Sequence, residues 1–207
     1  MAWIQREAAS TIGALRRAWR WILAVALVHL LAVTVGAVSV HTGYMPALAY
    51  RDRLVAQARS SDPVSLAYQR GENLKAGLVE AARTQVVCVA VAVTGLTVIS
   101  PFVLAATRGF VGGVVSVDEN HSSRLQHAGQ AVYYLSVIIL QIIPYALAGG
   151  AGIKLGLTLF RGGREYPGDR WLGYPKEAIW DVMRILVVTV PFVLVANLWE
   201  FLSPLNR

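Results

Sequence analysis

Residues 21–40, WILAVALVHLLAVTVGAVSV, contain no charged side chain. A helix of this length is about 30 Å long, which matches the hydrocarbon thickness of a bilayer. The whole chain has the same character, since 56% of its residues are hydrophobic and 15% are charged, whereas soluble domains carry about 25% charged residues. The sequence therefore predicts an integral membrane protein.

Other apolar stretches predict more membrane segments. The long apolar run 125–160 exceeds one crossing, and we expect Pro144 and the pair Gly149-Gly150 to divide it. The short run 109–117, GFVGGVVSV, predicts a re-entrant or half-buried piece. Further segments are predicted at 84–107, 129–148, 149–160 and 185–203. We expect an all-α, polytopic transmembrane helical bundle with about five membrane segments, one of them short or re-entrant.

The polar stretches predict two extramembrane parts. Residues 1–20 have an apolar stripe at helical spacing and a basic opposite side, which is typical of a helix lying on an anionic membrane surface; a docking helix for a partner is the alternative. The basic residues are Arg6, Arg16, Arg17 and Arg20. Residues 21–207 then form the transmembrane domain, with a helical hairpin outside the bilayer at 41–84 and a turn at 60–63.

The basic residues also predict the orientation. Arginines gather in the N-terminal segment and in the loop 161–184, and the positive-inside rule places both in the cytoplasm. Five crossings then put the hairpin 41–84 and the C-terminus outside. The net charge of +7 has the same origin, so nucleic-acid binding is not expected, because that needs a basic water-facing domain.

Polar side chains within the predicted spans are candidates for function. Glu200 and Asn197, one turn apart, predict either an anchor reaching the headgroups or a contact with an arginine or backbone group of another helix. Lys154 distinguishes between two functions. If it pairs inside the bundle with Glu200 or Gln141, a transport function is favoured. If it reaches an interface, a scaffold is favoured. We expect His29 to be buried and bonded to a backbone carbonyl, with haem ligation as the alternative.

Small residues predict where helices touch. Ala148, Gly152 and Gly156 are spaced by four, and this pattern lets two helices approach closely. We expect these residues, with Gly149, Gly150 and Gln141, to form a helix contact. Metal-ligand, phosphate-loop and nucleophile motifs are absent from the sequence, as are paired carboxylates within the predicted spans. The sequence therefore predicts a protein that is not an enzyme and holds no cofactor.

Three stretches resemble one family when taken in order. They are TRGFVGGVVSV (107–117), ALAGGAGIKLGLTLF (146–160) and VLVANLWEFLSPL (193–205). Together they resemble the stage II sporulation protein M family over residues 84–205. The resemblance implies an all-helical protein with several spans. Its sporulating relatives work with cell-wall hydrolases in remodelling the cell envelope, but many relatives form no spores, so that role is not implied for this chain.

The chain departs from the family pattern at two positions. The family commonly has a histidine and a glutamate in the helix before the glycine block. An alignment without gaps places Val137 and Gln141 there. The resemblance therefore does not imply a proton-linked or metal-linked role at that point.

These observations predict a non-catalytic membrane scaffold or accessory subunit in a bacterial or archaeal cell membrane. The N-terminus would be cytoplasmic. Its partners would be the lipid bilayer and other membrane subunits, or a second copy in a homodimer joined by the glycine face. The alternative is a small permease-like subunit of a transport complex, in which 109–117 and 149–160 line a path. A lack of buried charge in the sequence argues against this alternative.

Overall fold

The computed structural model describes residues 2–161 and 166–206 and is all-α, as predicted. The helices are α1 (Ala2–His41), α2 (Met45–Ser61), α3 (Pro63–Gln69), α4 (Asn73–Thr94), α5 (Ser100–Val114), α6 (Ala128–Arg161) and α7 (Lys176–Leu202). Two 3₁₀ turns, η1 (Gly95–Thr97) and η2 (Pro204–Asn206), follow α4 and α7. Strands β1 (Arg170–Trp171) and β2 (Tyr174–Pro175) pair in an antiparallel hairpin.

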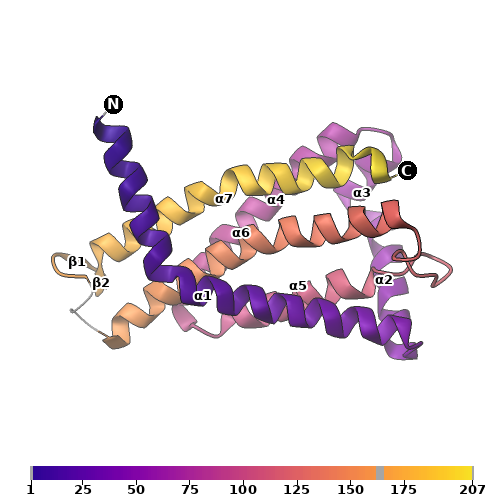
Figure 1. Cartoon of the computed structure of the whole chain (residues 1–207), viewed down its shortest axis with the longest axis horizontal. Helices are drawn as coiled ribbons and strands as arrows, with labels where there is room; N and C mark the ends of the chain where they lie inside the picture. The colour runs from indigo at the N-terminus through magenta and orange to yellow at the C-terminus, as the bar shows by residue number, and fades with distance from the viewer. Residues whose placement is uncertain (1, 162–165, 207) are drawn as a thin grey trace.

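The long helices run side by side along the molecule. Figure 1 shows α1, α4, α5, α6 and α7 along the long axis, with α2 and α3 at one end and the β1–β2 hairpin at the other. Helix α1 is bent, so that its N-terminal part crosses α7 while the remainder lies beside α5. It continues without interruption past residue 20, where the predicted surface helix ends.

The structure supports a membrane protein with several crossings. Among the described residues, four helices are long and apolar enough to span a bilayer: Gln5–His41, Asn73–Thr97, Ala128–Phe160 and Lys176–Leu202. Helix α5 has 15 residues, which at 1.5 Å per residue gives about 22 Å and falls short of a full crossing. The number of five membrane segments stays a prediction.

The short apolar helix of the structure is α5, and it does not coincide with either of the predicted short pieces, 109–117 and 149–160. The expected span 84–107 is wrong, because α4 ends at Thr94 and the chain reverses through η1 and Val98, whose φ is 67°. Pro101 lies in the first turn of α5, where its missing N–H costs no helical hydrogen bond. Residues Gly109–Val114 belong to α5, so 109–117 is not a separate re-entrant piece.

Helix α6 is one continuous helix, which corrects the predicted division into 129–148 and 149–160. Pro144 lies inside it, and residues 144–153 are all buried. Packing explains the continuity. Gly150 meets Ile22 of α1, and Gly152 meets Ala92 of α4 so closely that an added Cβ would overlap the Ala92 carbonyl oxygen. These contacts stabilise α6 across Pro144 and the glycines, which would weaken the same helix in isolation.

The predicted hairpin 41–84 is only partly correct. Helices α2 and α3 form it, with the side chain of Asp62 capping α3 by accepting a hydrogen bond from the Ser65 N–H. Its last third is already the start of α4, which begins at Asn73. The last helix likewise begins earlier than residue 185, at Lys176.

Candidate functional site

A cavity lined by polar side chains lies between the helices and reaches α3. Its volume is about 420 Å³. Tyr68 of α3, Phe201 of α7 and Arg124 of the loop after α5 line it at that end. Its other polar lining residues come from five helices and are His29, Glu80, Thr84, Arg108, Tyr133, Tyr134, Gln141, Tyr145 and Glu200.

Two carboxylates and two guanidinium groups share this cavity. They belong to Glu80, Glu200, Arg108 and Arg124, and the charge of Glu80 acts on Glu200. The expectation that the bundle lacks buried charge and paired carboxylates is therefore wrong. The sequence pattern places Glu80 in the outer hairpin and Arg108 at the end of a span, so it does not predict that their side chains share a cavity. Within the described residues, no group of three His, Cys, Asp or Glu side chains is placed to hold a metal ion.

Glu200 is held by helix α6. The side-chain amide of Gln141 donates a hydrogen bond to Glu200 Oε2 at 2.6 Å, and the Tyr133 hydroxyl donates to the Glu200 carbonyl oxygen at 2.6 Å. The structure thus joins two residues that the sequence singled out separately. Asn197 is buried and donates to the Val193 carbonyl oxygen of its own helix at 2.8 Å, so it does not reach an arginine.

Arg108 of α5 and His29 of α1 line the cavity together. The Arg108 guanidinium carbon is 6.0 Å from the centre of the Tyr145 ring, and Arg108 makes no hydrogen bond or ion pair with any residue the structure describes. His29 is 5% exposed, and its ring stacks beside Tyr145 at a centroid distance of 6.4 Å. Neither ring nitrogen is bonded to a described residue, which corrects the expected bond to a backbone carbonyl.

Small residues bring Arg108 to this place. Ala105, Gly109 and Gly113 are spaced by four along α5, and all are buried. A Cβ atom on Gly109 would overlap the His29 carbonyl oxygen, and α5 therefore packs backbone to backbone against α1. Arg108 is next to Gly109 in sequence, so the same contact holds its guanidinium close enough to His29 for its charge to act on the ring.

The opposite end of the bundle contains a second polar cluster. Arg17 makes a bidentate ion pair with Asp181 of α7, at 2.6 and 2.7 Å, and the Tyr166 hydroxyl donates to the same carboxylate. Lys154 lies here, with Nζ 5.8 Å from the centre of the Tyr166 ring, and therefore far along α6 from Gln141. Arg17 thus joins two helices, whereas Arg6, Arg16 and Arg20 are exposed as expected for a surface helix.

The glycine block makes its helix contact inside the chain. Ala148 is fully buried, Gly149 meets Pro101 and Val25, and Gly156 meets the backbone of Gly95 and Leu96. Gly150 and Gly152 are buried against α1 and α4, as described above. The expectation that this face joins two copies of the chain is corrected, because a buried surface is not open to a partner.

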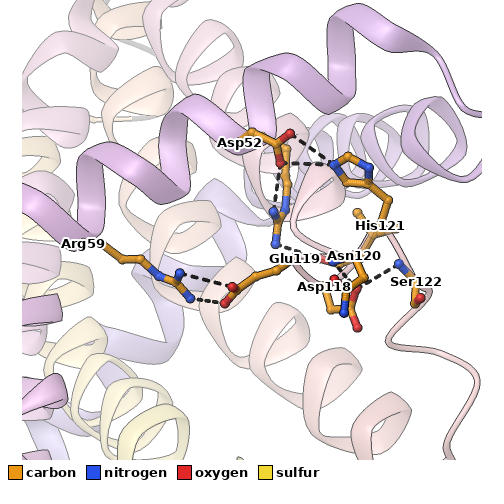
Figure 2. A network of polar contacts seen from close by, with 9 residues as sticks. Asp52, Arg59, Asp118, Glu119, Asn120, His121 and Ser122 are labelled. Atoms are coloured by element: carbon orange, nitrogen blue, oxygen red, sulfur yellow. Dashed lines mark hydrogen bonds and ion pairs between the residues drawn. The ribbon is translucent and has the colours of Figure 1, made fainter.

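A network of charges fastens α2 to the loop after α5. Figure 2 shows Asp52 pointing toward His121, while Arg59 of α2 is paired with Glu119. Arg51 donates to Asp52 at 2.9 Å, and His121 Nε2 lies 3.1 Å from the same carboxylate. These two hydrogen bonds, that of Arg51 first, hold the pKa of Asp52 below its usual value. The network lies at the same end of the molecule as α3 (Figure 1), which contributes Tyr68 to the cavity.

Comparison with known families matches this helical chain over nearly its whole length. The model of the family described as stage II sporulation protein M matches residues 12–204. The chain belongs to the stage II sporulation protein M family. No curated protein and no solved structure matches it. In this member of the family, Val137 and Gln141, which replace the histidine and glutamate implied by the resemblance, both line the cavity.

Sequence reasoning missed Glu80 and Arg108 although a signal for each was present. The buried small residues Gly77, Ala81 and Cys88 of α4 continue at helical spacing across residue 84. Ala105, Gly109 and Gly113 likewise continue across Arg108. A repeat of small residues that runs past a charge indicates that the helix continues and that the charge lies within the bundle.

Proposed function

We propose that this family member is a non-catalytic membrane protein that binds a small polar solute in its cavity, as a permease-like unit or a subunit of a transport complex. The observation that supports this proposal is the shared cavity of Glu80, Arg108 and Glu200. Ionisable side chains within membrane helices are costly, and they usually line a path or a binding site. The volume of about 420 Å³ suits a small ligand.

The proposed orientation places the α3 side of the cavity outside the cell. The end of the molecule with the arginine-rich start of α1 and the β1–β2 hairpin would face the cytoplasm of a bacterial or archaeal cell. The cavity reaches the other end, where Tyr68 of α3 lines it. Toward the cytoplasmic end the glycines of α6 pack closely on α1 and α4, so we expect a solute to enter from outside.

A scaffold or accessory subunit in a membrane complex is the second candidate. A shallow apolar groove on the exposed face of α4 favours it. The groove is lined by Ala82, Gln85, Val86, Val89, Ala90, Val93 and Thr94. Small and β-branched residues of this kind suit the close approach of a helix from another subunit. The apolar surface of this face is equally suited to lipid, so the cavity is the better guide to function.

Cysteine labelling tests whether the cavity is open to water. Val137 lines the cavity, whereas Val89 lies on the lipid-facing groove of α4. In a Cys88→Ala background, we expect a charged, membrane-impermeant thiol reagent to label Val137→Cys in intact cells. Labelling of Val89→Cys should be at least about tenfold slower, because a thiol in lipid stays protonated and unreactive.

A second measurement asks whether the cavity holds a solute. Native mass spectrometry of protein extracted gently from its own membrane should show a small bound molecule. The large substitution Val137→Trp fills the cavity and should abolish this bound mass, whereas Val89→Trp should retain it. Equal labelling of the two cysteine variants, or a bound mass unaffected by Val137→Trp, would contradict the proposal.

A further inference from the structure

We propose that the cavity binds a zwitterion, that is, a small molecule carrying an ammonium group and an acid group. The acid group would lie on Arg108 and His29, and the ammonium group would lie near Glu80. This inference rests on the proposed function and adds the chemistry of the ligand.

The acid end of the site rests on two side chains that have no hydrogen-bond partner among the described residues. His29 is 5% exposed, and neither of its ring nitrogens is bonded to a described residue. Buried polar groups in proteins are nearly always hydrogen-bonded, so an exception calls for an explanation. Arg108 lines the same cavity and makes no hydrogen bond or ion pair with the described part of the chain. A guanidinium fork beside an imidazole is suited to a carboxylate or phosphate.

The ring of Tyr145 orders this end of the site. It lies beneath Arg108, at 6.0 Å from the guanidinium carbon, and beside the His29 ring. A cation over an aromatic face is attracted to it while its N–H groups stay free to donate sideways. Arg108 is therefore positioned without using the donors that an acid group needs.

The ammonium end of the site rests on Glu80. Its nearest basic atom within the described residues is Arg83 Nη1 at 3.6 Å, which is longer than a hydrogen bond. The charge of Arg108 also acts on Glu80, so the two opposite charges lie near each other without being joined. An ammonium group placed near Glu80, with its acid group near Arg108, would satisfy both.

The overall charge of the lining favours a ligand that carries both charges. Two carboxylates and two guanidinium groups balance when all are ionised. A lone anion on Arg108 would face Glu80 and Glu200, and a lone cation on Glu80 would face Arg108. A zwitterion avoids both repulsions, because charge complementarity favours a ligand that repeats the separation of charge in the site.

Two sources could supply this chemistry. One is a free amino acid or a short peptide, and the other is the headgroup of phosphatidylethanolamine, which also joins an ammonium to an acid group. The cavity volume of about 420 Å³ accommodates either one. The experiment below has a separate arm for each.

The test measures protection of Val137→Cys, in the Cys88→Ala background, from a charged thiol reagent. The purified protein is placed in phosphatidylglycerol nanodiscs. One arm adds a mixture of the twenty L-amino acids with L-alanyl-L-alanine, and matched arms add N-acetyl-alanyl-alanine or alanyl-alanine amide. A further arm replaces part of the lipid with phosphatidylethanolamine.

We expect the free zwitterions, or phosphatidylethanolamine, to slow labelling at least tenfold, while the acetylated and amidated analogues have little effect. Arg108→Gln should still be labelled but should lose the protection, and Arg108→Lys should retain part of it. Protection by the acetylated compound alone, or by no compound, would overturn the zwitterion site while leaving the proposed function standing. If Val137→Cys is not labelled at all, the proposed function itself fails.

Discussion

At the residue scale, charged side chains within the bundle serve two different purposes. Asp181 is fully partnered, since Arg17 and Tyr166 donate to its carboxylate and Arg184 lies 3.5 Å away. Arg108, by contrast, has no hydrogen bond or ion pair with a described residue. The first arrangement stabilises the fold, because each polar atom is compensated. The second leaves donors available in a cavity, which is the state expected of a binding residue.

The substitution Asp181→Asn tests the structural cluster. The Asp181 side chain is 5% exposed and that of Arg17 is 31% exposed. Removing the carboxylate charge leaves Arg17 without its partner, and breaking such a pair costs about 3 kcal/mol. We expect a lower free energy of unfolding, measured by denaturation in mixed detergent micelles. Asp169→Asn is the control, because the exposed Asp169–Lys176 pair should contribute less than about 1 kcal/mol.

At the element scale, backbone contacts between helices decide where each helix begins, ends and continues. Helix α6 passes Pro144 because residues 144–153 are enclosed by α1, α4 and α7. Helix α5 is held on α1 through Gly109 and Gly113. Local sequence preference predicts a break near Pro144 in α6 and a helix end at the charged Arg108 in α5. Tertiary packing overrides both preferences, since in proteins it supplies most of the stability of a helix.

The pair Gly152→Ala and Gly129→Ala tests this packing. An added Cβ on Gly152 would overlap the Ala92 backbone, whereas an added Cβ on Gly129 would meet nothing within 4 Å. We expect Gly152→Ala to lower the free energy of unfolding by about 1–3 kcal/mol through overpacking. Gly129→Ala should leave it unchanged or raise it by up to about 1 kcal/mol. Micelle denaturation gives both values, and equal effects at the two positions would refute the close contact of α6 with α4.

At the scale of the whole molecule, the two ends of the bundle differ in the elements that they contain. One end has the arginine-rich start of α1 and the β1–β2 hairpin, and the other has α2, α3 and the loop after α5 (Figure 1). The network of Asp52, Arg59, Glu119 and His121 joins α2 to that loop (Figure 2). The cavity reaches the second end, where Tyr68 of α3 lines it, so we expect the orientation in the membrane to determine which compartment supplies its ligand.

Single cysteines at the two ends test this orientation. Ser61 and Trp171 are both exposed, the first in α2 and the second in β1. In the Cys88→Ala background, we expect an impermeant reagent to label Ser61→Cys in intact cells. Trp171→Cys should react only after the cells are permeabilised, because the positive-inside rule places that end in the cytoplasm. The reverse result would invert the orientation, and labelling of both in intact cells would refute an odd number of crossings between them.

The sequence by itself determined the class of protein, the long apolar helices and the family. Each of these depends on local properties: hydropathy over about twenty residues, or the order of short motifs. Only the tertiary structure decided that α6 is continuous, that the glycine block packs inside the chain, and that Glu80, Arg108, Gln141 and Glu200 meet in one cavity. These features depend on contacts between helices far apart in the chain. A local repeat of small residues can place a charge within the bundle, but it does not show which side chains that charge meets.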